Sequence, residues 1–150
     1  MTPLNVFRAV AVTEAITWAA LLAGMVVKYV PEAPFEGELG VQVFGPVHGV
    51  AFIAYCLVTV LVAVDQGWSR GRTVLGLFSA VPPLMTIWFD RHVERHGGLD
   101  VRWHSHEQSP TAAQRGVCWL LRHQTQALTG FVVAVAALTG VALLAGPPVG

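Results

Sequence analysis

Glu14 and His48 are the two side chains best placed to do chemistry, because each is an ionisable group inside a long apolar run. Glu14 lies in the run from Leu4 to Val30. His48 lies in the run from Val41 to Val64, which contains no Lys, Arg, Asp or Glu. Runs of that length have the size of membrane-spanning helices. An ionisable group at such a depth costs free energy unless it is protonated, paired or hydrated, so both residues need partners from other helices or water.

The sequence leaves two interpretations of Glu14 open. A carboxyl group that takes up and releases a proton would suit a proton-coupled carrier. The alternative is a protonated carboxyl that hydrogen-bonds a nearby hydroxyl group, for which the candidates are Thr13, Thr17, Tyr55 and Thr59. For His48 the alternatives are a structural hydrogen bond to Asp90 or metal and proton chemistry. Haem ligation would need a second histidine at similar depth, and His123 is the candidate.

Antiparallel stacking of the helices, at about 1.5 Å rise per residue, predicts which side chains lie level. Arg8 falls level with Asp65 at one end of the bundle, and Glu14 falls deep in the core. A polar cluster is expected at the opposite end, beneath an acidic loop; its members are Lys28, His48, Asp90, Arg91 and His123.

A second group of histidines follows the third apolar run. His92 and His96 are four residues apart and share a helix face, and the segment His104-Ser105-His106-Glu107 comes a short loop later. Four such groups could close a tetrahedral zinc site, so the spacing suits zinc or another transition metal. The alternative is a solvated histidine cluster at the membrane interface.

The elements that must position these residues are helices. With 54% hydrophobic and 12% charged residues, the chain has too little polar surface for a soluble domain. Its zero net charge offers no electrostatic footprint for nucleic acid. The sequence predicts an all-α, polytopic membrane bundle with the lipid bilayer as its partner. Four transmembrane helices are expected at about residues 4–30, 41–64, 73–95 and 116–146, the third kinked at Pro82-Pro83.

We expect one integral membrane domain over residues 1–150, in the cell membrane. Ala11, Ala15, Ala19 and Ala23 form a small-residue stripe on the first helix, and Gly45 and Gly49 form a second face for close approach. Four crossings would put both termini on one side. That side would hold three of the nine Lys and Arg residues, which favours both termini outside the cytoplasm.

Several motifs in the first 95 residues occur together. Arg8 and Glu14 lie in the first run, Gly45-Pro46-Val47-His48-Gly49 in the second, and Pro82-Pro83 with Phe89-Asp90-Arg91 in the third. This combination resembles the YdzA-like family of small bacterial integral membrane proteins (domain of unknown function 3817) over about residues 5–95. Where that family has a Pro-Phe-Gly type motif, this chain has Pro82-Pro83-Leu84, and residues 96–150 look like an addition. The resemblance implies a membrane location and the site residues Arg8, Glu14, His48, Asp90 and Arg91, without an established activity.

Three function classes follow, and an enzyme is not the expected one. Small size and small-residue faces favour a structural or accessory subunit that binds other membrane proteins or itself. Glu14 and His48 favour a small transporter or proton-coupled carrier. The four histidines, His92, His96, His104 and His106, favour a membrane metal-binding protein.

Overall fold

The computed structural model of the protein describes residues 2–29, 37–103 and 112–145. In those ranges the regular elements are helices, which confirms the all-α fold class. They are α1 (Pro3–Tyr29), α2 (Gly37–Asp65), α3 (Arg70–Phe78), α4 (Met85–Arg95), α5 (Ala112–Arg122) and α6 (Gln124–Ala145).

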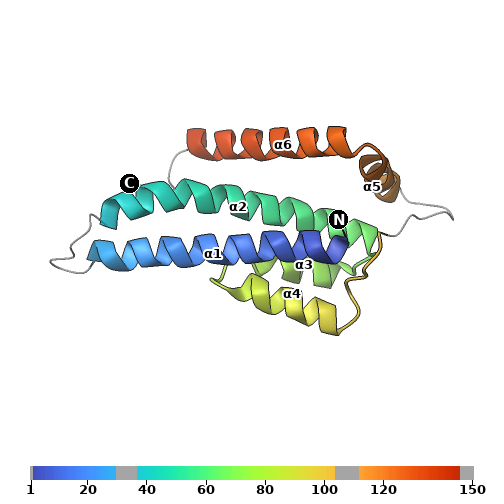
Figure 1. Ribbon diagram of the computed structural model, residues 1–150, viewed down its shortest axis with the longest axis horizontal. Helices are drawn as coiled ribbons and strands as arrows, with labels where there is room; N and C mark the ends of the chain where they lie inside the picture. Colours follow the sequence, from blue (N-terminus) through green and yellow to red (C-terminus); the bar gives the residue numbers. More distant parts are fainter. Residues whose placement is uncertain (1, 30–36, 104–111, 146–150) are drawn as a thin grey trace.

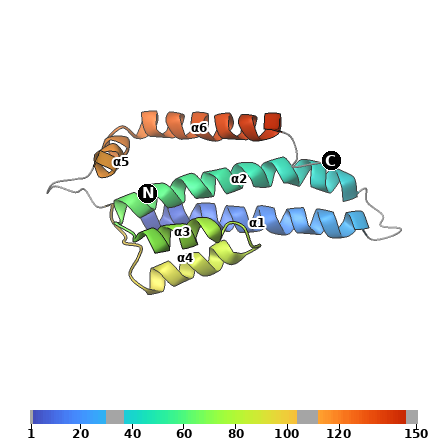
Figure 2. The same cartoon turned by 180° about the vertical axis from the view of Figure 1, so that it is seen from behind.

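The long helices α1 and α2 form an antiparallel pair at the centre of the molecule (Figure 1). We call the end where α1 begins and α2 ends the hairpin end, because the helical hairpin formed by α3 and α4 lies there. The opposite end, where α1 ends and α2 begins, is the loop end. Helix α6 runs along α2 on the side away from α1, while α3 and α4 occupy the other side of the pair at the hairpin end (Figures 1 and 2).

Two of these helices, α1 and residues Gly40–Asp65 of α2, are long and apolar enough to cross a membrane, by length and composition. Many of their apolar side chains face outward: Ile16 and Val26 are each 63% exposed. Outward-facing apolar side chains are what contact with lipid requires, so both helices suit a bilayer better than water.

The predicted third span is not one kinked helix. Helix α3 ends at Phe78, the chain reverses over residues 79–84, and α4 starts at Met85. Pro82 and Pro83 lie in the reversal, where missing amide hydrogens cost no helical hydrogen bond. Leu84, which follows them, has a left-handed backbone with φ of 65°. The prolines therefore end a helix here instead of bending it.

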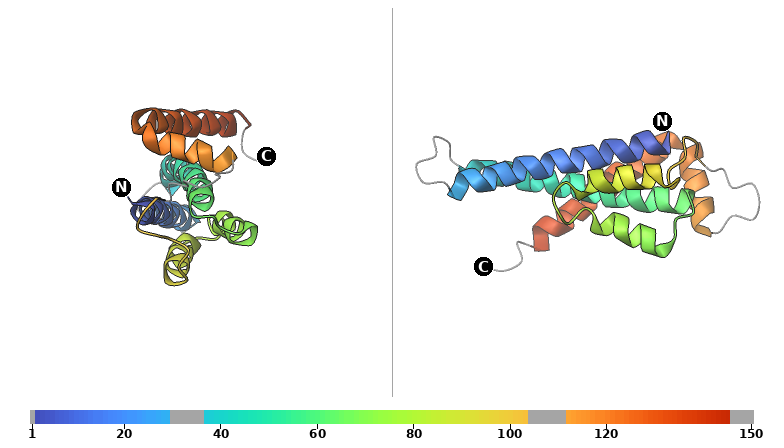
Figure 3. Two further views of the ribbon diagram at one scale, coloured as in Figure 1. Left: turned by 90° about the vertical axis from the view of Figure 1, so that its right-hand side faces the viewer. Right: turned by 90° about the horizontal axis from the view of Figure 1, so that it is seen from below.

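The α3–α4 hairpin starts and finishes at the same end of the bundle (Figure 3). At its base the indole Nε1 of Trp68 donates to the carbonyl of Gly98, 2.5 Å away. At its tip the indole Nε1 of Trp18 donates to the carbonyl of Ala80 over 3.3 Å. Since Trp18 lies near the middle of α1, the hairpin reaches about half the length of that helix and then returns.

The predicted fourth span, residues 116–146, is divided into α5 and α6 by a break at His123. Helix α6 leads from the hairpin end toward the loop end (Figure 1). The start of α1 and the end of α6 therefore lie at opposite ends of the bundle. The expectation of both termini on one side is wrong for these helices, because the third apolar run turns back.

The best-packed part of the core lies between α1, α2 and the hairpin. Phe7 of α1 packs on Tyr55, Trp68 and Phe89, with ring centroids 5.6, 5.8 and 6.1 Å away. Trp68 and Phe89 also pack edge to face, 5.7 Å apart. Such aromatic pairs stabilise a fold beyond the area they bury, so this cluster fixes the hairpin end.

Glycines also bring the central helices together, at a different place from the predicted one. A Cβ atom built on Gly24 would lie 3.1 Å from the backbone carbon of Gly40, so α1 and α2 approach closely near the loop end. A Cβ built on Gly45 or Gly49 would meet no described atom within 4 Å. The predicted close-approach face at Gly45 and Gly49 is therefore wrong for contacts among the described residues of this chain.

Candidate functional site

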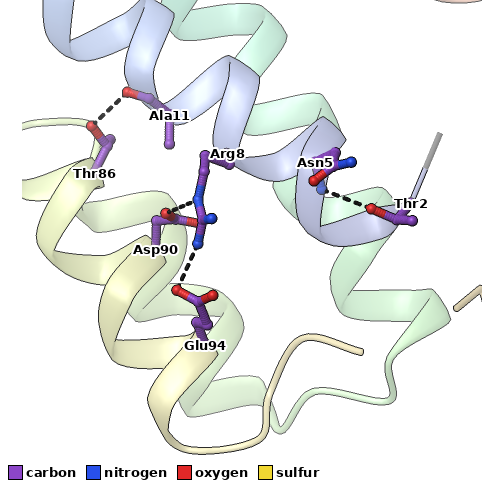
Figure 4. Close-up of polar contacts among 7 residues, drawn as sticks. All are labelled: Thr2, Asn5, Arg8, Ala11, Thr86, Asp90 and Glu94. Atoms are coloured by element: carbon purple, nitrogen blue, oxygen red, sulfur yellow. Dashed lines mark hydrogen bonds and ion pairs between the residues drawn. The ribbon is translucent and has the colours of Figure 1, made fainter. Parts of the chain in front are cut away.

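An ion-pair network joins α1 to α4 at the hairpin end (Figure 4). The Nε atom of Arg8 donates to Oδ2 of Asp90 over 3.1 Å, and its Nη2 atom donates to Oε2 of Glu94 over 2.6 Å. Asp90 is buried, whereas the side chains of Arg8 and Glu94 are about 40% exposed. The buried carboxylate of Asp90 is therefore paired with the guanidinium of Arg8, which is itself partly exposed at the surface.

Glu14 lies one to two helical turns deeper than Arg8 and is fully buried. Its Oε2 atom lies 2.7 Å from the hydroxyl Oγ1 of Thr86, and that hydroxyl lies 3.2 Å from the backbone carbonyl of Ala11. A threonine hydroxyl has one hydrogen, so it cannot donate to both oxygens. Both contacts are satisfied when Glu14 is protonated and donates to Thr86, which donates to Ala11. The geometry thus favours a neutral Glu14.

Two carboxyl oxygens in this region, Oε1 of Glu14 and Oδ1 of Asp90, are buried without a hydrogen-bond partner among the described residues. Buried polar atoms without partners are uncommon and point to function, bound water or strain. We call the contacts of Arg8, Asp90, Glu94, Glu14 and Thr86 the α1–α4 seam. The seam is where this molecule could bind or pass a proton.

His48 belongs to a different place. Its Nδ1 atom lies 3.1 Å from the hydroxyl of Thr17, and its ring packs 4.7 Å from the ring of Trp18. The predicted hydrogen bond to Asp90 is wrong, because α4 turns back and carries Asp90 to Arg8. His48 is instead one α1–α2 contact, linked through the Thr17 hydroxyl to the carbonyl of Glu14.

The structure does not assemble the predicted five-residue polar cluster. Lys28 is in the last turn of α1 at the loop end, while Asp90 and Arg91 are on α4 at the hairpin end. His123 is exposed at the break between α5 and α6, where its Nδ1 atom lies 3.0 Å from the carbonyl of Trp119. The prediction failed because it treated residues 73–95 as a crossing helix.

Tyr55 fastens α3 to α2. Its hydroxyl lies 2.9 Å from Oγ of Ser79 and donates to the carbonyl of Gly76 over 3.1 Å. Glu14, for which Tyr55 was one predicted partner, bonds Thr86 instead. Tyr55 is fully buried, so its hydroxyl has no access to water. The hydrogen bonds to Ser79 and Gly76 take the place of hydrogen bonds to water.

The model of the domain of unknown function DUF3817 matches residues 4–95, more than half of the chain. The chain belongs to this family. The DUF3817 region includes α1 except its first residue, all of α2, α3 and α4, and therefore the whole α1–α4 seam. The resemblance inferred from the sequence motifs is confirmed.

A relative from Streptomyces coelicolor, provisionally named as a membrane protein, is 52% identical over 97 residues. Those residues make up 64% of this chain and 11% of the relative, so the chain matches a small part of a much longer protein. No solved structure matches the chain. The name of the relative and the two candidate spans together support membrane localisation.

The histidines lie mostly outside the DUF3817 region. His92 and His96 are adjacent on α4, with ring centroids 4.2 Å apart, whereas His104 and His106 lie outside the described residues. In the described ranges no three His, Cys, Asp or Glu side chains come together as a metal site. The zinc hypothesis stays a prediction.

Thr86 and Glu94 are site residues that the sequence motifs did not single out. They lie four residues before and after Asp90, so all three share one face of α4. The sequence already contained this spacing, and three polar residues on one helix face indicate that the face meets polar partners on another helix. Arg8 and Glu14, which lie on that other helix, were singled out for a different reason, namely their place in an apolar run.

Proposed function

We propose that this DUF3817 protein is a structural or accessory subunit of a larger assembly in the cell membrane. The observation that carries the proposal is the α1–α4 seam: its ionisable groups bond one helix of this chain to another. Arg8 binds both carboxylates of α4, and Glu14 binds Thr86. Side chains used in this way hold a scaffold together. The relative gives further support, since the same unit forms 11% of a far longer chain.

In this proposal the chain passes through the bilayer three times, not four, with α3–α4 as a re-entrant hairpin. Helices α1 and α2 have 27 and 29 residues, and a span needs about 20. Helix α6 has 22 residues, and its apolar part, Thr125–Val141, lies at the short end of the range for a span. Backbone that is not helical is tolerated at membrane depth where protein buries it. The reversal over residues 79–84 meets that condition in part, because Ser79 and Ala80 are buried and bonded to α2 and α1.

The distribution of basic residues supports the hairpin end as the cytoplasmic one. Eight of the nine Lys and Arg residues belong to that half of the bundle, and Lys28 is at the loop end. The eight are Arg8, Arg70, Arg72, Arg91, Arg95, Arg102, Arg115 and Arg122. Cytoplasmic ends carry the excess of basic residues, so α1 starts inside the cell. This orientation reverses the one that four crossings favoured.

Isolation of the tagged chain from its own membranes tests the accessory role. The chain is expressed at its natural level, extracted with surrounding lipid, and its companions are quantified by mass spectrometry. We expect one or more membrane proteins at a fixed ratio to the tagged chain. A multi-pass protein of similar abundance, tagged in the same way, is the control. Recovery of the chain alone, or only with copies of itself, would contradict the proposal.

Proton transfer through Glu14 is the second candidate, favoured by the buried Oε1 atom of Glu14 that lacks a described partner. In liposomes with an entrapped pH indicator, wild-type protein should then speed the decay of a pH gradient. Glu14→Gln should abolish this effect, because an amide cannot exchange a proton in the same way. Asp100→Asn is the matched control, since Asp100 is an exposed carboxylate outside the seam. Equal decay rates with wild type and Glu14→Gln would rule the candidate out.

A further inference from the structure

The outward face of α4 carries an open groove with a volume of about 420 Å³. We call it the α4 groove. Six of its lining residues are Leu84, Trp88, Arg91, His92, Arg95 and His96. This face lies at the hairpin end, and its lining contains two guanidinium groups and two imidazoles and no carboxylate.

The two carboxylates of α4 are directed to the other face of the helix. Asp90 and Glu94 both bind Arg8 of α1 (Figure 4). In the described part of the chain neither Arg91 nor Arg95 has an ion pair, and both are exposed. The seam therefore directs both acids of α4 away from the groove, with Arg8 offsetting one of their two charges, and the outer face of α4 keeps Arg91 and Arg95 as its charged groups.

Aromatic rings run along the groove from its apolar end to its basic end. The indole of Trp88 stacks on the ring of His92 with centroids 5.1 Å apart, and His92 stacks on His96 at 4.2 Å. Trp88 and Leu84, nearest the hairpin tip, are each 51% exposed. An exposed indole beside arginines is typical of the level of lipid headgroups.

We propose that the α4 groove binds the headgroup of an anionic phospholipid from the leaflet at the hairpin end. Arg91 and Arg95 contact the phosphate oxygens, because guanidinium groups match phosphate geometry and stay charged. Trp88 and Leu84 contact the glycerol region and the first methylene groups of the acyl chains. The apolar end of the groove argues for a lipid over a free phosphate ion, which would gain nothing from these two side chains. The proposal does not depend on the accessory role, but it rests on the proposed topology, in which the hairpin end lies in one leaflet.

Native mass spectrometry of the full chain tests this inference. The protein is released from mixed micelles that contain equal amounts of phosphatidylglycerol and phosphatidylcholine, and retained lipids are counted. We expect preferential retention of phosphatidylglycerol by wild type and a roughly thirtyfold fall in that preference in Arg91→Gln/Arg95→Gln, since each of the two basic residues removed contributes about 1 kcal/mol near anionic lipid.

The matched control is Arg115→Gln/Arg122→Gln, which removes the same charge from α5, on the far side of α2 from α4 (Figure 1). These arginines are exposed as well, so both double variants should fold, which thermal unfolding in the same detergent verifies. The control should keep the preference within about twofold of wild type.

Three results would overturn the inference. The first is an equal loss of preference in both double variants, which would indicate general charge attraction. The second is an unchanged preference in Arg91→Gln/Arg95→Gln. The third is displacement of phosphatidylglycerol from wild type by millimolar inorganic phosphate, which would make the ligand a soluble anion. Retention of the preference by Trp88→Phe and its fall in Trp88→Ser would support the lipid contact further.

Discussion

Arg8 connects α1 to both carboxylates of α4 through two nitrogens of one guanidinium group. Its planar fork can bond two carboxylates at once, which a lysine ammonium does with less geometric precision. The burial of Asp90 makes this connection matter, because a buried carboxylate without its cation keeps the full cost of desolvation.

Arg8→Gln should therefore destabilise the protein by about 2–3 kcal/mol, because Asp90 would stay buried without its counter-charge. Chemical unfolding in detergent measures the loss. Arg70→Gln removes the same charge from an exposed site of α3 and should change stability by about 0.5 kcal/mol or less. Combining Arg8→Gln with Asp90→Asn should cost less than the sum of the two single changes. Additive losses would show that the two side chains are not coupled.

At the scale of elements, the α3–α4 hairpin depends on a glycine. A Cβ atom built on Gly76 would lie 2.9 Å from Cε1 of Phe89 and 3.0 Å from Cγ2 of Thr59. Gly76 thus allows α3 to rest on α2 and on the first half of α4 together, and its carbonyl accepts hydrogen bonds from Tyr55 and Ser79.

Gly76→Ala should lower the free energy of unfolding by about 1–3 kcal/mol, because the added methyl group has no space. Gly71→Ala, in the same helix, is the control: its Cβ would meet no described atom within 4 Å. An alanine there should stabilise α3 by up to about 1 kcal/mol through helix propensity. Thermal unfolding of both variants in one detergent gives the comparison. Equal effects of the two substitutions would contradict the packing described here.

The sequence predicted the long helices well and the hairpin poorly, for a physical reason. The runs at 4–30 and 41–64 lie close to α1 and α2, because more than twenty apolar residues leave few alternatives to a helix. Pro82-Pro83, in contrast, is compatible with a kink and with a reversal. Contacts distant in sequence, such as Trp18 with Ala80, decide between them.

The predicted partners of the site residues depended on that decision. Arg8, Glu14 and Asp90 were singled out as candidates and all three belong to the α1–α4 seam, while their functional role stays a prediction. Their partners were wrong, because levels calculated for a crossing helix placed Asp90 beside His48. The spacing of Thr86, Asp90 and Glu94 follows from the sequence, but the facing helix does not.

For the whole molecule, the proposed topology can be tested by cysteine labelling. Cys56 and Cys118 are first replaced by serine, and single cysteines are placed at Tyr29, Gly71 or Val101. These sites are exposed and lie at the end of α1, the start of α3 and beyond α4. An impermeant thiol reagent should label position 29 from outside intact cells, and positions 71 and 101 only after permeabilisation.

Labelling of position 101 from outside, together with position 29, would mean that the third run crosses the bilayer after all. Position 71 serves as the internal control, because it lies on the cytoplasmic side of the membrane in both topologies. The experiment therefore separates the hairpin from a kinked span without relying on the charge rule.

In the proposed topology, the half-length hairpin also gives the molecule an unequal cross-section in the two leaflets. In the described residues, α3, α4 and α5 lie in the half at the hairpin end beside parts of α1, α2 and α6, whereas the other half lacks α3, α4 and α5 (Figures 1 and 3). Such a body is a wedge, and it displaces more lipid from one monolayer than from the other. We expect it to concentrate where the membrane bulges toward the cytoplasm, a preference that reconstitution into vesicles of graded diameter would measure and that uniform incorporation at every diameter would exclude.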